Sequence, residues 1–216
     1  MSIQTAHTCT LPAPALSLHY LRYLPPSYED SEELFPLVIF LHGAGERGDN
    51  LDLVTLHGWP RYAREGTEYP FILISPQLPA DHHWCGQVNT LNGLLDHLLS
   101  TLRVDPKRVY VTGLSDGGTG TWLWGINNAS RFAALIPVCG AGIRWACYEL
   151  VKTPVWAFHG DADGAIECEE SVRLVERVNL CGGNARLTVY PDVGHDCWTH
   201  AYTDPALIEW MLEQHL

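Results

Sequence analysis

The fold of this chain is decided by RVYVTGLSDGG, residues 108–118. A β-branched and aromatic run ends at Gly113, one serine follows, and two further glycines lead into residues 119–124, where a helix is expected. Gly-x-Ser-x-Gly between a strand and a helix predicts a nucleophile elbow, a tight turn that raises Ser115 above a sheet. Such a turn strains the serine backbone and leaves no room for a Cβ atom at Gly113 and Gly117. The alternative is a glycine-rich loop with an incidental serine.

The segments on either side of this turn alternate between strand and helix patterns. Continuous apolar runs, typical of strands covered on both faces, occupy residues 36–41, 71–76, 133–139 and 153–160, with a last strand at 185–190. Helices are expected at 91–102, 169–180 and 205–216. This alternation predicts the α/β class, a mostly parallel doubly wound sheet with helices on both faces. The strand expected at 16–24 would add an antiparallel edge.

Length indicates one domain. A chain of 216 residues is large enough for a core of its own, so residues 1–216 are expected to form a single unit. No insertion is long enough to build a cap domain. Residues 1–15 are predicted to be an irregular N-terminal extension.

Composition restricts the partners and the compartment. A net charge of −12 argues against nucleic acid or an anionic membrane surface as a partner, because both attract basic patches. The first residues lack a basic and then apolar run, so no secretory signal is expected, and no apolar run has the length to cross a bilayer. Seven scattered cysteines, an odd number, favour reduced thiols and a cytoplasmic location. Nothing in the composition predicts the oligomeric state.

Polar residues follow several of the expected strands, where ligands bind in open parallel sheets. Ser115, Asp163 and His195 occur in the chain order of an α/β-hydrolase triad. Ser115 is the expected nucleophile, His195 the base that accepts its proton, and Asp163 the acid that orients the imidazole. Asp161 is the alternative acid, and otherwise a loop-capping carboxylate.

An oxyanion needs fixed donors, and the glycine-rich loop at residues 42–50 is placed to supply one. The backbone N–H groups of Ala44 and Asp116 are the expected pair, with Gly43 the other candidate and a residue in close contact with the substrate. His42 is expected to be structural. Glu46 and Arg47 are expected to hold this loop by ion pairs or hydrogen bonds.

Four segments together resemble a known family: FLHGAGERGDN, RVYVTGLSDGGTGTW, FHGDAD and YPDVGHDCWTHAY. They are similar to the cap-less serine esterases of the α/β-hydrolase superfamily. The closest group comprises predicted peptidases and phospholipase/carboxylesterase-like proteins, which are related to the prolyl oligopeptidase catalytic domain. The resemblance covers about residues 16–213. It implies the α/β-hydrolase fold, and it implies Asp163 as the acid because the family places it third after His159 and Gly160.

The chain departs from this family at two places. Asp116 stands where relatives carry methionine or another neutral residue, and Gly164 and Ala165 stand where they often carry Pro and Val. The Asp116 carboxylate either points away from the pocket, towards the helix amides or a basic side chain, or faces it and selects substrates that carry positive or hydrogen-bond-donating groups. Either arrangement makes it an electrostatic modulator.

Two further groups of residues allow more than one interpretation. Trp84 and Trp198 are candidates for the wall of a substrate pocket, with core packing the alternative. A soft-metal site could be drawn from His82, His83, Cys85, Cys197 and His200, but no spacing supports it.

The sequence therefore predicts a cofactor-independent carboxylic-ester hydrolase that acts on small, short-acyl esters through an acyl-enzyme. A serine peptidase or amidase with the same triad, a non-catalytic binding protein of the same fold, and a metal-dependent hydrolase are the alternatives.

Overall fold

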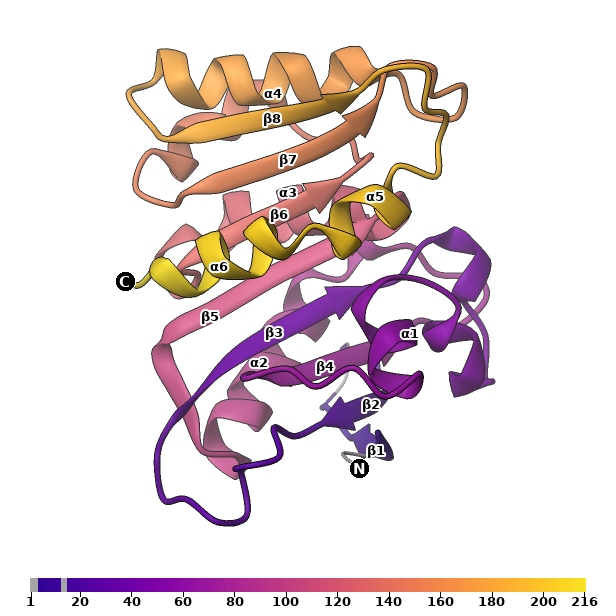
Figure 1. Ribbon diagram of the computed structural model, residues 1–216, viewed down its shortest axis with the longest axis vertical. Coiled ribbons are helices and arrows are strands. Elements are labelled where there is room, and N and C mark those ends of the chain that lie inside the picture. The colour runs from indigo at the N-terminus through magenta and orange to yellow at the C-terminus, as the bar shows by residue number, and fades with distance from the viewer. Residues whose placement is uncertain (1–3, 13–14) are drawn as a thin grey trace.

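The structure is a computed structural model that describes residues 4–12 and 15–216. Its centre is one eight-stranded sheet in the order β1-β2-β4-β3-β5-β6-β7-β8 (Figure 1). The strands are β1 Thr5–Cys9, β2 Leu18–Tyr23, β3 Phe35–Leu41, β4 Ile72–Gln77, β5 Val104–Leu114, β6 Ala134–Val138, β7 Val155–Gly160 and β8 Ala185–Tyr190. The α-helices are α1 Gly58–Arg64, α2 Val88–Thr101, α3 Asp116–Asn128, α4 Cys168–Leu180, α5 Trp198–Thr203 and α6 Pro205–Glu213.

Strands β3 to β8 run parallel to their neighbours, and β1 and β2 form an antiparallel edge against β4. The α/β prediction, including the antiparallel edge, is confirmed. Within residues 15–216 the connections between strands build no further domain over the strand ends.

The helices cover both faces of the sheet because the buried strands are apolar on both sides. In β3, Leu37 and Ile39 face one core together with α2, α3 and α4, while Val38 and Phe40 face a second core with α1, α5 and α6. Figure 1 shows α5 and α6 in front of the sheet and α2 and α3 behind it.

The expected turn joins β5 to α3. Ser115 lies between the two elements with φ 56° and ψ −116°, a conformation that non-glycine residues rarely adopt. A Cβ atom at Gly117 would lie 1.9 Å from the carbonyl oxygen of Leu41, and one at Gly113 would lie 2.4 Å from that of Gly117. The strained serine and the exclusion of Cβ atoms, both predicted from the motif, are confirmed.

The N-terminal region and two helices differ from the prediction. Residues 5–9 form β1, so the expectation of an irregular extension was wrong there, while residues 1–3 and 13–14 lie outside the described residues. Strand β1 is mostly exposed and pairs with β2 alone, so its residues carry little apolar alternation. Helices α1 and α5, seven and six residues long, are too short to show a helical period.

None of the helices in the described part of the chain combines the length and apolar character that crossing a membrane requires.

Candidate active site

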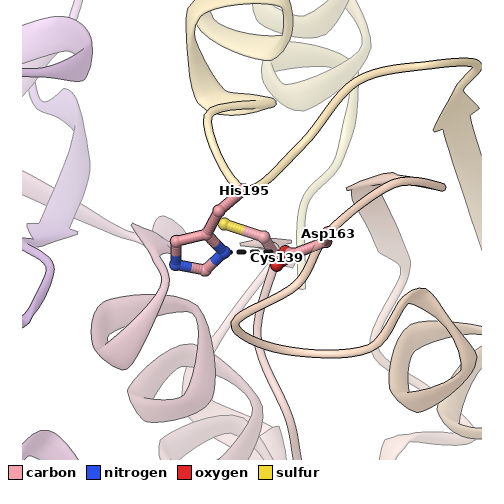
Figure 2. Close-up of side chains that lie close together, drawn as sticks. All are labelled: Cys139, Asp163 and His195. Carbon is pink, nitrogen blue, oxygen red and sulfur yellow. Dashed lines mark hydrogen bonds and ion pairs between the residues drawn. The ribbon is translucent and has the colours of Figure 1, made fainter.

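Three side chains from separate loops meet above the carboxyl ends of β5, β7 and β8. His195 Nε2 lies 2.8 Å from Ser115 Oγ, and His195 Nδ1 lies 2.7 Å from Asp163 Oδ2. Figure 2 shows the contact between His195 and Asp163. A carboxylate can only accept, so Nδ1 carries the proton and donates, which leaves the Nε2 lone pair facing the serine hydroxyl. This is the arrangement in which an imidazole can remove a proton from Ser115.

The Asp163 carboxylate is buried and fixed from several sides. Its Oδ1 accepts hydrogen bonds from the N–H groups of Ala165 (2.8 Å) and Ile166 (3.0 Å). Burial raises the pKa of Asp163, but the hydrogen bonds from His195 and these two amides together lower it by more than burial raises it. The pKa of Asp163 therefore lies below its ordinary value. Asp163 therefore stays ionised beside His195 at neutral pH.

Asp161 occupies a different position. It is exposed, and its Oδ1 accepts a hydrogen bond of 2.7 Å from the backbone N–H of Asp192. It therefore caps the start of the neighbouring loop that follows β8, a loop-capping role of the kind given as the alternative from the sequence.

A second histidine lies behind the acid. His159, fully buried at the end of β7, has its Nε2 2.9 Å from the carbonyl oxygen of Ile166 and 3.2 Å from Asp163 Oδ2. Since both neighbours are acceptors, Nε2 carries the proton, and Nδ1 accepts from the hydroxyl of Ser171 at 2.7 Å. His159 thus holds the Asp163 loop and shields its carboxylate from water.

Cys139 completes the buried side of the site. It directly follows β6 with φ 41°, and the ligand-type atoms of Cys139, Asp163 and His195 all lie within 4.8 Å of one another (Figure 2). The pKa of the Cys139 thiol is raised, and burial is the largest cause. The thiol is therefore neutral at physiological pH. His195 Nδ1 already donates a hydrogen bond to Asp163. The group of Cys139, Asp163 and His195 is therefore the buried side of the Ser–His–Asp arrangement.

The candidate oxyanion donors each begin a helical segment. Ala44 is the first residue of the 3₁₀ turn Ala44–Glu46, and Asp116 is the first residue of α3. The N–H groups of first helical residues have no partner inside their own helix, so both are available to an anion. Gly43 lies against Ser115: a Cβ atom placed on Gly43 would be 3.6 Å from Ser115 Cβ.

His42 holds the two segments that flank the site. Its Nδ1 lies 2.6 Å from the carbonyl oxygen of Gly43, and its Nε2 accepts a hydrogen bond of 3.0 Å from the N–H of Leu78. The ring therefore requires the neutral form, and burial, the largest influence, lowers its pKa to about 4. The structural role expected for His42 is confirmed.

Glu46 and Arg47 hold the glycine-rich loop at residues 42–50, as expected. Arg47 Nε donates to the carbonyl oxygen of Ala44 at 2.8 Å. The Glu46 carboxylate is buried, with Oε1 3.7 Å from His57 Nε2, and burial raises the pKa of Glu46. His57 also contacts Trp198, whose ring centre lies 5.4 Å from that of His195.

The two tryptophans differ in position. Trp198 is partly exposed beside His195, so it stays a candidate for the pocket wall. Trp84 is fully buried and its Nε1 donates to the carbonyl oxygen of His42 at 2.9 Å. The prediction that Trp84 lines a substrate pocket was wrong, and it packs in the core below the loop.

The histidines and cysteines considered for a metal are dispersed. His83 contacts Arg47 and Asp116, Cys85 is exposed, and Cys197 is buried. In the part of the chain that the structure describes, the one group of three close ligand-type residues is the Cys139 trio.

Comparison with known proteins identifies the family. Residues 83–203, more than half of the chain, match the Dienelactone hydrolase family. The chain belongs to this family. It is a hydrolase of the carboxylesterase type, and the resemblance inferred from the four sequence segments is confirmed.

Individual relatives of this family member agree with that assignment. The chain is 24% identical to acyl-protein thioesterase 1 of Gibberella zeae, over 81% of this chain and 89% of the relative. A solved thermostable esterase superposes with a TM-score of 0.87 at 29% identity, covering 99% of this chain. The chain spans 63% of that esterase's length. Est1E from Butyrivibrio proteoclasticus has the same fold, with a TM-score of 0.70 at 18% identity over 96% of this chain and 98% of the other.

Three side chains at the site escaped the sequence analysis. His57 immediately precedes α1, a helix too short to predict, and His159 and Cys139 lie at strand ends inside apolar runs. Their positions at the carboxyl ends of β7 and β6 were the available signal, because residues there face the site in any parallel sheet.

The buried neutral His42 predicts a loss of stability in acid. The unfolded chain binds a proton at His42 near pH 6.5 and the folded protein only near pH 4, so this contribution is complete above pH 6.5 and is lost as the pH falls towards 4. The free energy of unfolding should fall between pH 7 and pH 4.5 in both proteins. We expect the fall to be about 2 kcal/mol smaller in His42→Gln than in wild type, because the variant lacks the buried imidazole. Urea unfolding at both pH values measures the difference. Parallel losses in the two proteins would contradict the neutral buried ring.

Proposed function

We propose that the protein hydrolyses small carboxylic esters through an acyl-enzyme formed on Ser115. The observation that carries the proposal is the continuous hydrogen-bonded line from Ser115 Oγ through His195 to Asp163, with contacts of 2.8 and 2.7 Å. Such a line converts a weakly nucleophilic hydroxyl into a reactive one.

In the first half of the reaction Ser115 Oγ attacks the ester carbonyl carbon while its proton passes to His195 Nε2. The carbonyl oxygen becomes an anion that accepts hydrogen bonds from the N–H groups of Ala44 and Asp116. Asp163 stabilises the imidazolium without taking its proton. The C–O bond to the alcohol then breaks, the alcohol leaves with the proton from His195, and the acyl group stays on Ser115.

In the second half a water replaces the alcohol. His195 removes a proton from the water, whose oxygen attacks the acyl carbon, and a second oxyanion forms between Ala44 and Asp116. The bond to Ser115 Oγ breaks, the serine regains its proton from His195, and the carboxylic acid departs. No cofactor takes part in this scheme.

The substrate class follows from the open surroundings of the site. The connections between strands in residues 15–216 build no cap, and the partly exposed Trp198 lies beside His195 as the candidate side wall. A pocket of this kind covers a short acyl chain but leaves a long one in water. Short-acyl esters are therefore the proposed substrates.

Ser115→Ala is expected to remove ester turnover, with a loss on the order of a million-fold in kcat. The assay is hydrolysis of p-nitrophenyl butyrate by the purified protein, with the urea unfolding midpoint as the control for the fold. A serine-directed phosphonate should label wild type and leave the variant unmodified in the mass spectrum. Wild-type activity in the variant would show that Ser115 is not the nucleophile, and loss of wild-type turnover to a chelator would favour the metal-dependent alternative.

Asp163→Asn and Asp161→Asn form a matched pair. Asparagine at 163 can no longer hold the Nδ1–H tautomer of His195, and we expect a loss of roughly 10⁴-fold in kcat, the scale known for such a triad. Asp161→Asn keeps an acceptor for the N–H of Asp192 and should stay within about threefold of wild type. The opposite ranking would transfer the role of the acid to Asp161.

Acyl-chain preference tests the substrate class. Each methylene that finds no apolar cover forgoes about 0.8 kcal/mol of transfer free energy, so kcat/KM should be higher for p-nitrophenyl butyrate than for the palmitate. A preference for palmitate would contradict the shallow pocket. The p-nitroanilide of butyrate, run in parallel, tests the peptidase or amidase alternative, which predicts comparable turnover of the amide.

A further inference from the structure

The two candidate oxyanion donors lie on segments far apart in sequence. Ala44 follows β3 and Asp116 follows β5, and an oxyanion is bound well only if both N–H groups keep one relative position. Each of these residues is also held through another of its own polar groups. Ala44 is held through its carbonyl oxygen and Asp116 through its carboxylate.

The Ala44 end is held by Arg47. Its Nε donates to the carbonyl oxygen of Ala44 at 2.8 Å, and its Nη1 donates to the carbonyl oxygen of His82 at 3.2 Å and lies 2.9 Å from His83 Nε2. One planar guanidinium thus joins the oxyanion loop to the loop that precedes the 3₁₀ turn Trp84–Gly86.

The Asp116 end is held by the same loop. His83 Nδ1 lies 3.1 Å from Asp116 Oδ1, and the backbone N–H of Trp84 donates to Oδ2 at 3.3 Å. The Asp116 side chain is 13% exposed and its carboxylate bonds to this loop, which is the first of the two arrangements considered from the sequence.

The partners determine the protonation of His83. An arginine can only donate and a carboxylate can only accept, so the bridge needs Nε2 as acceptor and Nδ1 as donor. The neutral ring with its proton on Nδ1 meets both demands. A continuous chain of hydrogen bonds then runs from the carbonyl oxygen of Ala44 through Arg47 and His83 to Asp116.

We propose that His83 and Arg47 are positioning residues for the oxyanion hole, and that Asp116 stands after the nucleophile to receive this link. The inference rests on the proposed function, because it gives the link a role in the same reaction. The bridge fixes the spacing of the N–H groups of Ala44 and Asp116. Neither bridging side chain touches the reacting atoms.

His83→Ala breaks the bridge at its exposed centre. A displacement of the donors by a fraction of an ångström to 1 Å acts on the transition state, so kcat for p-nitrophenyl butyrate should fall about 10- to 100-fold while KM changes less than about threefold. Binding of butaneboronic acid, which forms a tetrahedral adduct on the serine, should weaken by a similar factor. The matched control is His82→Ala, because the His82 ring pairs with the exposed Asp81 and only its backbone carbonyl meets Arg47. That variant should retain kcat within about twofold.

Two further variants keep the test independent of folding. His83→Gln offers an amide donor and acceptor to the same partners, so it should recover much of the kcat lost in His83→Ala at an unchanged urea midpoint. Asp116→Ala removes the other end of the link, and the double variant with His83→Ala should lose no more than the larger single loss, since both changes break one chain.

The outcomes separate the two proposals. If Ser115→Ala is inactive while His83→Ala keeps wild-type kcat, or raises KM at constant kcat, the bridge is overturned and the esterase mechanism stands. Equal impairment of His83→Gln and His83→Ala in folded proteins, or additive losses in the double variant, would also overturn it. Activity retained by Ser115→Ala would remove the proposed function and with it this inference.

Discussion

The contact between the backbones of Gly117 and Leu41 is the constraint on which the site depends. Helix α3 begins so close to the end of β3 that no Cβ atom fits at position 117. That approach forces the chain through the strained turn at Ser115, and it also brings whatever follows Leu41 alongside the serine. The glycine-rich loop at residues 42–50 follows Leu41 directly. One steric contact therefore sets the conformation of Ser115 and brings Gly43 next to it.

The order of the strands explains why the remaining groups converge. Strands β5, β6, β7 and β8 are consecutive neighbours in the sheet. The segments that follow them carry, in the same order, Ser115, Cys139, Asp163 and His195. Neighbouring strands are about 4.8 Å apart, and the histidine starts from the far end of this row. Its loop returns across β7, where the N–H of Ala162 donates to the carbonyl oxygen of Val193 at 3.0 Å. Asp163 and His195 are thus positioned by the same crossing.

The parts of this arrangement that depend on local chemistry could be predicted from the sequence. The buried strands and the elbow each follow from residue types within one short segment, and the order of Ser115, Asp163 and His195 is read along the chain. Trp84 could not be placed in this way, because it packs against a segment distant in sequence, where its Nε1 donates to the carbonyl oxygen of His42, 42 residues away. Strand β1 gave too little apolar alternation, since it is an exposed edge. His83 and Asp116 meet only in the folded chain, so the direction of the carboxylate stayed open.

A negative side chain directly after Ser115 is at first sight unfavourable to the oxyanion of the proposed mechanism. A single carboxylate about 7 Å away would raise the energy of that anion by roughly 2 kcal/mol at an effective dielectric constant near 20. Here the carboxylate does not act alone: both oxygens accept from N–H groups, and the bridge through His83 ends at the cation of Arg47. A linked anion and cation would present a dipole to that oxyanion, and the field of a dipole falls off faster than that of a charge. The N-terminus of α3 stabilises the same carboxylate by about 0.3–1 kcal/mol. The fold therefore accommodates Asp116 because it supplies the positive partner on the opposite loop.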